Sequence, residues 1–129
     1  MSAEKRTLIV TDGTVSIQGI AQSIADVLAG YRVKICPAQE FAGTDLLPAE
    51  TFFLGCEEPH PVSFSYLAEM LEHINLAGRK CGIFSTNEKA LEYLQELVKD
   101  SEAALGEPLR VSDEINAQTI KKWLDEFLK

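Results

Sequence analysis

Short apolar runs alternate with amphipathic stretches along the chain. The runs are rich in β-branched and aromatic residues, as buried strands are, and they lie at residues 7–11, 32–36, 51–55, 80–85 and 109–111. Apolar residues recur at helical spacing at residues 20–28, 64–74, 90–98 and 120–127, whereas residues 38–47 are only weakly helical. Strands that alternate with helices form a parallel sheet with helices on both faces. The pattern predicts an α/β fold, a three-layer sandwich around a five-stranded parallel sheet.

No linker or low-complexity segment interrupts this pattern, so we expect a single domain of residues 1–129. No apolar run approaches the roughly 20 residues that a membrane-spanning helix needs. Residues 1–6 are polar and lack the apolar segment of a signal peptide, which favours a cytoplasmic location. The cysteines are widely spaced without a CxxC motif, so we expect reduced thiols packed at strand ends, at Cys36, Cys56 and Cys81.

The chain is strongly acidic, with 20 Asp and Glu residues, 12 Lys and Arg residues and a formal net charge of -8. This charge repels the phosphates of nucleic acids and the surface of anionic membranes, so we expect neither as a partner. It suits docking to redox or regulatory proteins that have basic surfaces, or it simply keeps the protein soluble.

Three stretches carry a resemblance to a known family. Residues 51–55 (TFFLG), 75–85 (NLAGRKCGIFS) and 106–123 resemble strands three to five of the flavodoxin family, and the likeness covers nearly the whole chain. The resemblance implies a flavodoxin-like sheet with strand order 2-1-3-4-5. It also implies that three loops at the carboxyl ends of the strands hold flavin mononucleotide (FMN), which carries one electron at a time to redox-enzyme partners. The chain would then be an electron carrier or a binding domain and not an enzyme by itself.

The loop after the first strand aligns with the family's phosphate loop, whose usual sequence is Ser/Thr-x-Thr-Gly-x-Thr. The aligned residues are Asp12, Gly13, Thr14, Val15, Ser16 and Ile17. The Thr14 and Ser16 hydroxyls and the backbone amides of Val15 to Gln18 are candidates to face an anion at the positive end of the helix dipole.

Three residues of this loop oppose a phosphate. Val15 stands in place of the glycine that turns the backbone toward the phosphate, and Ile17 replaces the final threonine hydroxyl. Asp12 places a carboxylate where a phosphate dianion would approach. The alternative interpretation of Asp12 and Gly13 is a turn in which the aspartate bonds the local backbone.

The other two loops also depart from the family. The second normally stacks an aromatic ring on the flavin, and here His60 is the only flat ring, beside the carboxylates of Glu57 and Glu58. His60 is either a flavin neighbour or an exposed residue between two prolines. In the third loop Thr86 or Asn87 is expected to cap the following helix.

Other kinds of site fit less well. A response-regulator receiver needs an aspartate at the end of the third strand, and that strand ends in Gly55 and Cys56. Cys56, Glu57 and His60 supply only three metal ligands of mixed softness. Cys56 is a weak candidate nucleophile, because the acidic neighbours Glu57 and Glu58 would raise the pKa of its thiol.

Two helical stripes have ordinary structural explanations. Trp123 and Phe127 match the core-facing side of a terminal helix, and Glu88, Glu92 and Glu96 match a solvated one. We therefore expect a flavodoxin-like protein that binds FMN weakly or not at all and acts through protein partners. The alternative is a working FMN-dependent electron carrier.

Overall fold

The computed structural model describes residues 6–28, 32–41, 49–99, 101–111 and 116–127. The strands are β1 (Arg6–Thr11), β2 (Arg32–Pro37), β3 (Thr51–Gly55), β4 (Lys80–Ser85), β5 (Ala104–Leu105) and β6 (Leu109–Arg110). The helices are α1 (Val15–Val27), α3 (Ser65–His73), α4 (Glu88–Lys99) and α5 (Ala117–Phe127), with short 3-10 turns η1 (Ala38–Glu40) and η2 (Val62–Phe64).

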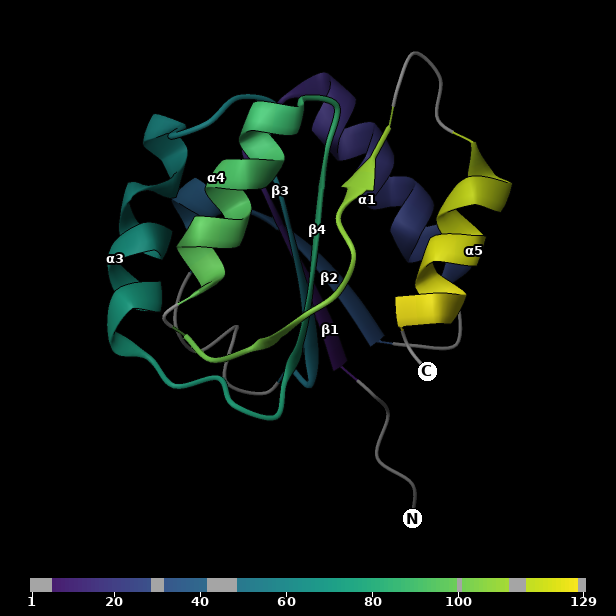
Figure 1. The fold of residues 1–129 in the computed structure, drawn as a ribbon. Coiled ribbons are helices and arrows are strands. Elements are labelled where there is room, and N and C mark those ends of the chain that lie inside the picture. Colours follow the sequence, from purple (N-terminus) through teal and green to yellow (C-terminus); the bar gives the residue numbers. More distant parts are fainter. Residues whose placement is uncertain (1–5, 29–31, 42–48, 100, 112–115, 128–129) are drawn as a thin grey trace.

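All paired strands are parallel, in the order β2-β1-β3-β4-β5, which confirms the predicted α/β class and strand order. Figure 1 shows α3 and α4 on one side of the sheet and α1 and α5 on the other. The three-layer arrangement is therefore also as predicted. Of the weakly helical segment, residues 38–40 form η1, and residues 42–47 lie outside the described residues.

The final strand differs from the prediction. The sequence pattern predicts one strand at 109–111; the structure has β6 there and an additional short strand, β5, before it, separated by an interruption, and both pair with β4. The interruption falls at residues 106–108, where Gly106 still donates its backbone N–H to the Cys81 carbonyl at 3.0 Å. Pro108 has no N–H to donate, so continuous pairing is lost here.

Alternate residues of the central strands build the core on both faces. Phe52 and Leu54 of β3 pack with residues of α3 and α4, whereas Phe53 packs with Trp123 and other residues of α1 and α5. This period of two is what a sheet buried on both faces requires. The expected placement of Trp123 is confirmed, since it is only 8% exposed and its ring lies 5.7 Å from that of Phe53.

α1, α4 and α5 begin before the first residue of their apolar stripes, whereas α3 begins at Ser65, one residue after Phe64. α1 begins at Val15, five residues before Ile20, the first residue of its apolar stripe, and buries Ile17, Ile20 and Ile24. The expected solvated face of α4 is confirmed, because Glu88, Glu92 and Glu96 are all exposed. No helix among the described residues is both long and apolar enough to cross a membrane.

Gly82 permits the close approach of β4 to the α5 layer. A Cβ atom at this position would lie 2.5 Å from the Phe53 ring and 3.0 Å from the Trp123 indole. We expect Gly82→Ala to lower the free energy of unfolding by about 1–3 kcal/mol through overpacking, measured by urea denaturation. Gln95→Ala, on the exposed face of α4, is the control and should change stability by less than about 0.5 kcal/mol. Equal stability of Gly82→Ala and the wild type would contradict this account of the packing.

Candidate functional site

The carboxyl ends of β1, β3 and β4 meet at one edge of the sheet, because these strands are direct neighbours and run parallel. The loops that follow them, residues 12–14, 56–61 and 86–87, therefore lie together above this edge, at the top of Figure 1. Open parallel sheets bind ligands at such an edge. This is where the sequence places its candidate site residues.

The Asp12 carboxylate binds two of these loops together. Its Oδ1 atom accepts hydrogen bonds from the Thr14 backbone N–H at 3.0 Å and from the Thr14 hydroxyl at 2.7 Å. Its Oδ2 atom accepts the Glu57 backbone N–H at 2.7 Å, across 45 residues of sequence. Asp12 thus makes the local turn expected from the sequence and a second, non-local contact. The backbone N–H groups of Thr14 and Glu57 therefore already donate to an anion, which is the carboxylate of Asp12.

The tight turn of the first loop is at Gly13, whose φ is +82°, and not at Val15. Val15 is instead the first residue of α1, and its side chain is 90% exposed. The chain therefore makes its tight turn two residues before the position at which the resemblance places the family's glycine. The Gln18 backbone N–H is also hydrogen-bonded already, because it donates to the Thr14 carbonyl at 2.9 Å within the helix. Ile17 is fully buried in the core.

The two hydroxyls that the sequence nominates have different environments. Thr14 donates its hydroxyl to Asp12, so that donor is directed at a carboxylate. The Ser16 Oγ atom is buried and, among the described residues, is the one buried side-chain oxygen or nitrogen without a hydrogen-bond partner. An unpaired buried hydroxyl is costly, by about 1–3 kcal/mol, so it marks a position where a polar group is missing.

The second loop packs against α4. Glu57 and Glu58 are exposed, as is His60. The His60 ring nevertheless contacts Tyr93 of α4, with ring centroids 4.4 Å apart. His60 has a φ of +54°, a left-handed conformation that costs roughly 1–3 kcal/mol in a residue other than glycine. The ring contact helps to hold the loop in this strained conformation.

The third loop is bonded to the second. Ser85, at the end of β4, donates its hydroxyl to the Cys56 carbonyl at 2.6 Å and accepts the Asn87 backbone N–H at 3.0 Å. Asn87 caps α4 as expected, because its Oδ1 atom accepts the Lys89 N–H at 3.0 Å. Thr86 is half-buried beside it.

Sequence reasoning missed three residues that organise this edge. Thr11 and Ser85 are polar residues at the ends of apolar strands and are fully buried; the Thr11 hydroxyl donates to the Gln18 side chain at 3.0 Å. A hydroxyl at the last position of a buried strand is the signal that identifies both. Tyr93 lies within the apolar stripe of a helix, and nothing in the local sequence links it to His60.

Cys36, Cys56 and Cys81 are buried and none of them is in a disulfide bond, which agrees with the prediction of reduced, packed thiols. Burial and, to a smaller extent, the Asp12 carboxylate raise the pKa of Cys56 to about 12, so the cause is not the glutamates named in the sequence analysis. Burial and then Cys56 raise the pKa of Tyr93 to about 12. Among the described residues, no three His, Cys, Asp or Glu side chains are grouped to hold a metal ion, so Cys56, Glu57 and His60 do not form such a site.

Comparison with solved structures gives the fold a name. No family model matches the sequence, and no curated protein shows significant sequence similarity to it. The structure superposes on a short-chain flavodoxin associated with a bacterial microcompartment (TM-score 0.84, 12% identity, 98% of this chain and 97% of the other). It also superposes on oxidised flavodoxin 2 from Bacillus cereus (0.81, 20%, 95% and 97%) and on Fusobacterium nucleatum flavodoxin bound to FMN (0.72, 13%, 96% and 96%). The fold is flavodoxin-like.

The raised pKa of Cys56 leads to a test of the site's geometry. Only about one Cys56 thiol in ten thousand is ionised at pH 8 when its pKa is about 12, and the thiol is also buried. We expect Cys56 in the native protein to react with iodoacetamide at least about 100-fold more slowly than free cysteine, as measured by peptide mass spectrometry. The same residue in urea is the control and should react at the rate of free cysteine. Rapid alkylation of native Cys56 would show that the thiol is accessible and ionised.

Proposed function

We propose that this chain is a flavodoxin-like protein that binds FMN weakly or not at all and acts through protein partners with basic surfaces. In this role it is a binding domain and not an enzyme by itself, and its place is the cytoplasm. The resemblance to flavodoxins and the fold support the general class. The chemistry of the first loop supports the narrower assignment.

The observation that carries the proposal is the position of the Asp12 carboxylate. It accepts hydrogen bonds from the Thr14 hydroxyl and from the amides of Thr14 and Glu57, so a phosphate in this loop would have to displace it. If it stayed, two anions would face each other at short range, which costs on the order of a few kcal/mol where water is excluded. The loop as it stands does not fit the FMN phosphate.

The alternative function, an FMN-dependent electron carrier, has one specific observation in its favour. The buried Ser16 Oγ lacks a partner at the N-terminal turn of α1, where the helix dipole favours an anion. An anion that displaced Asp12 would meet a hydroxyl donor there. In the binding-domain function the Asp12 carboxylate occupies the first loop, and in the electron-carrier function the FMN phosphate does.

A partner surface at the same edge fits the proposal. Val15 at the start of α1 is 90% exposed and Val62 in η2 is 89% exposed, and both follow loops that Asp12 joins. Glu57 and Glu58 are exposed on the second of these loops. Exposed apolar side chains beside carboxylates suit a partner that presents an apolar contact flanked by lysine or arginine.

The role of Asp12 is tested by Asp12→Asn, which removes the charge and retains the size of the side chain. We expect the wild type to bind FMN weakly and the variant to bind it at least about tenfold more tightly, because roughly 1.4 kcal/mol or more of like-charge repulsion is removed. Isothermal titration calorimetry measures both affinities. Riboflavin, which lacks the phosphate, should show no such gain.

Glu58→Gln is the matched control, because it removes an exposed carboxylate from the neighbouring loop and should leave FMN affinity nearly unchanged. Wild-type protein purified with one tightly held FMN per chain would refute weak binding. An equal gain with riboflavin would show that Asp12 does not act on the phosphate.

The partner surface is tested by the double substitution Val15→Ser and Val62→Ser. Both side chains are exposed, so the fold should be retained while the apolar contact is lost. We expect proteins cross-linked to the wild type in cell extract to be lost with the double variant and at high salt, as measured by quantitative mass spectrometry. Tyr66→Ser, which changes a 54% exposed side chain on α3, is the control and should retain them. Unchanged cross-linking by the double variant would place the partner elsewhere.

A further inference from the structure

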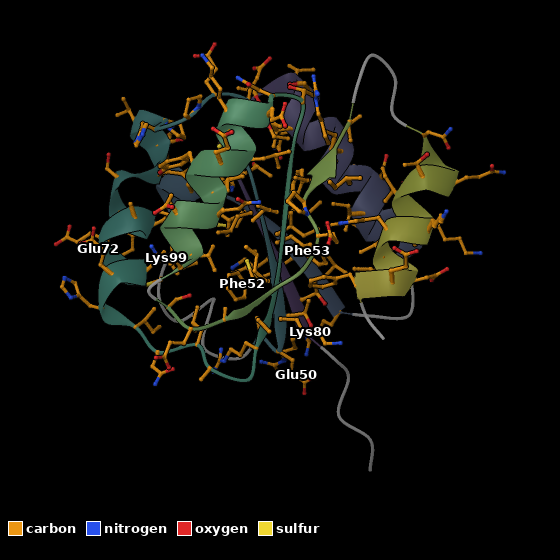
Figure 2. All side chains as sticks on the ribbon, viewed as in Figure 1. Glu50, Phe52, Phe53, Glu72, Lys80 and Lys99 are labelled. Atoms are coloured by element: carbon orange, nitrogen blue, oxygen red, sulfur yellow. The ribbon has the colours of Figure 1, made fainter. Side chains whose placement is uncertain are left out.

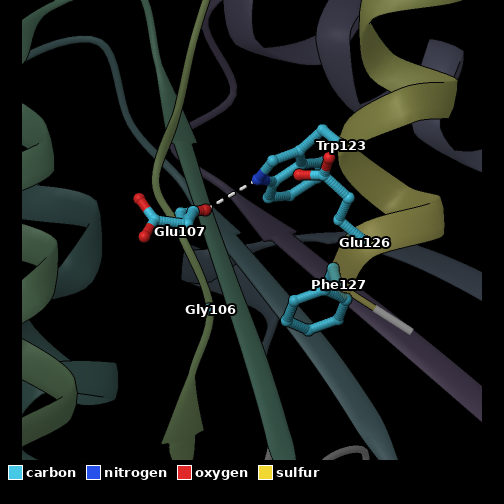
Figure 3. Close-up of a pocket in the computed structure, with 5 residues that line it drawn as sticks. All are labelled: Gly106, Glu107, Trp123, Glu126 and Phe127. Atoms are coloured by element: carbon cyan, nitrogen blue, oxygen red, sulfur yellow. Dashed lines mark hydrogen bonds between the residues drawn. The ribbon is translucent and has the colours of Figure 1, made fainter. Parts of the chain in front are cut away.

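A pocket of about 130 Å³ lies against the interruption of the final strand (Figure 3). Gly106 and Glu107 of the interruption and Trp123, Glu126 and Phe127 of α5 line it. It is away from the loops of the candidate site, because Gly106 bonds Cys81 near the beginning of β4, whereas those loops follow the ends of the strands. Sites for cofactor-sized ligands measure roughly 300–1,000 Å³, so this pocket accommodates the end of a single side chain.

Two aromatic residues line the pocket with what their rings leave exposed: Trp123 is 8% exposed and Phe127 is half-buried, and both rings pack against Phe53. The Trp123 and Phe127 rings are stacked, with centroids 5.8 Å apart and planes inclined by 19°. The Trp123 Nε1–H donates to the Glu107 carbonyl at 2.6 Å, the dashed line in Figure 3, so this N–H is not available to a ligand. The faces of such rings carry negative electrostatic potential and attract cations.

The charged side chains that line the pocket, Glu107 and Glu126, are also negative. Glu107 and Glu126 are exposed at its rim. Figure 3 shows the Glu107 carboxylate directed away from the indole, and its exposure leaves it room to rotate toward a ligand. α5 ends at Phe127, so the negative end of the helix dipole is also here; Lys80 already donates to the Phe127 carbonyl, at 3.4 Å. The end of α5 therefore already has a cation, and a cation at a partner's surface would complement the aromatic rings and the two rim carboxylates.

We propose that this pocket receives the guanidinium group of an arginine on the surface of a partner protein. A guanidinium is planar and weakly hydrated, so it stacks on aromatic rings and pairs with a carboxylate, which an ammonium group does less well. Leu105 in β5 is 39% exposed next to the pocket and extends the contact with an apolar surface. The proposal is independent of whether the loops at the sheet edge hold FMN.

Trp123 is the one tryptophan in the chain, so its fluorescence reports on this pocket directly. The probes are the capped tripeptides Gly-Arg-Gly, Gly-Lys-Gly and Gly-Gln-Gly, titrated into the full chain. We expect a saturable change of Trp123 emission with the arginine peptide, a weaker affinity for the lysine peptide and no saturable change with the glutamine peptide. Equal affinities for arginine and lysine, or saturable binding of glutamine, would overturn the proposal.

Two variants with the same change in net charge separate the pocket from general attraction to an acidic protein. Glu126→Gln should weaken the arginine peptide's affinity about two- to fivefold, the size of an exposed ion pair. Glu72→Gln, on α3 at the far side of the sheet (Figure 2), should leave the affinity within error of the wild type. Equal affinities of the two variants would refute a site at Trp123. Both positions are exposed, so thermal unfolding that matches the wild type should verify that each variant is folded.

Discussion

The arrangement of the sheet edge depends on the hydrogen bonds of a single carboxylate. Asp12 accepts hydrogen bonds from the turn that contains it and from the loop after β3, so it fixes the start of α1 relative to that loop. Hydrogen bonds to charged groups are each worth roughly 1.5–3 kcal/mol. A ligand anion must therefore replace all of these contacts before it gains any affinity of its own. The bonds that order the loops also engage donors that a phosphate at this position would need.

Buried hydroxyls extend this arrangement to all three loops. Ser85 joins the Cys56 carbonyl to the Asn87 amide, and Thr11 joins the end of β1 to Gln18. Each hydroxyl meets backbone or side-chain groups that the ends of strands leave unpaired. Ser16 is the exception, since its buried oxygen lacks a partner among the described residues. In the first loop the Asp12 carboxylate thus has its hydrogen-bond partners, whereas the Ser16 hydroxyl, in the first turn of α1, has none among the described residues.

Local sequence patterns predict most of the fold but only part of the site. Alternating apolar runs and helical stripes predict the three-layer α/β class, because burial on both faces leaves a strong periodic signal, whereas the strand order follows from the resemblance to flavodoxins. The interruption at residues 106–108 is missed, since β5 is only two residues long and both are exposed. The capping role of Asn87 is local and was predictable. The contact from Asp12 to Glu57 spans 45 residues, and the pairing of His60 with Tyr93 joins a loop to helix α4, so neither is encoded in a local motif.

The position of the core explains how a flavodoxin-like fold accommodates an altered loop. Phe52, Phe53 and Phe84 are almost completely buried within the sheet layers, below the edge where Asp12 lies. Ile17 is the link between the two regions, because it packs in the core while the residues just before it form the turn. Its conversion to threonine, which the family's phosphate loop would require, would place a hydroxyl in an apolar layer. The packing of α1 thus constrains the last position of the loop, whereas the Val15 side chain is 90% exposed and the core does not constrain position 15.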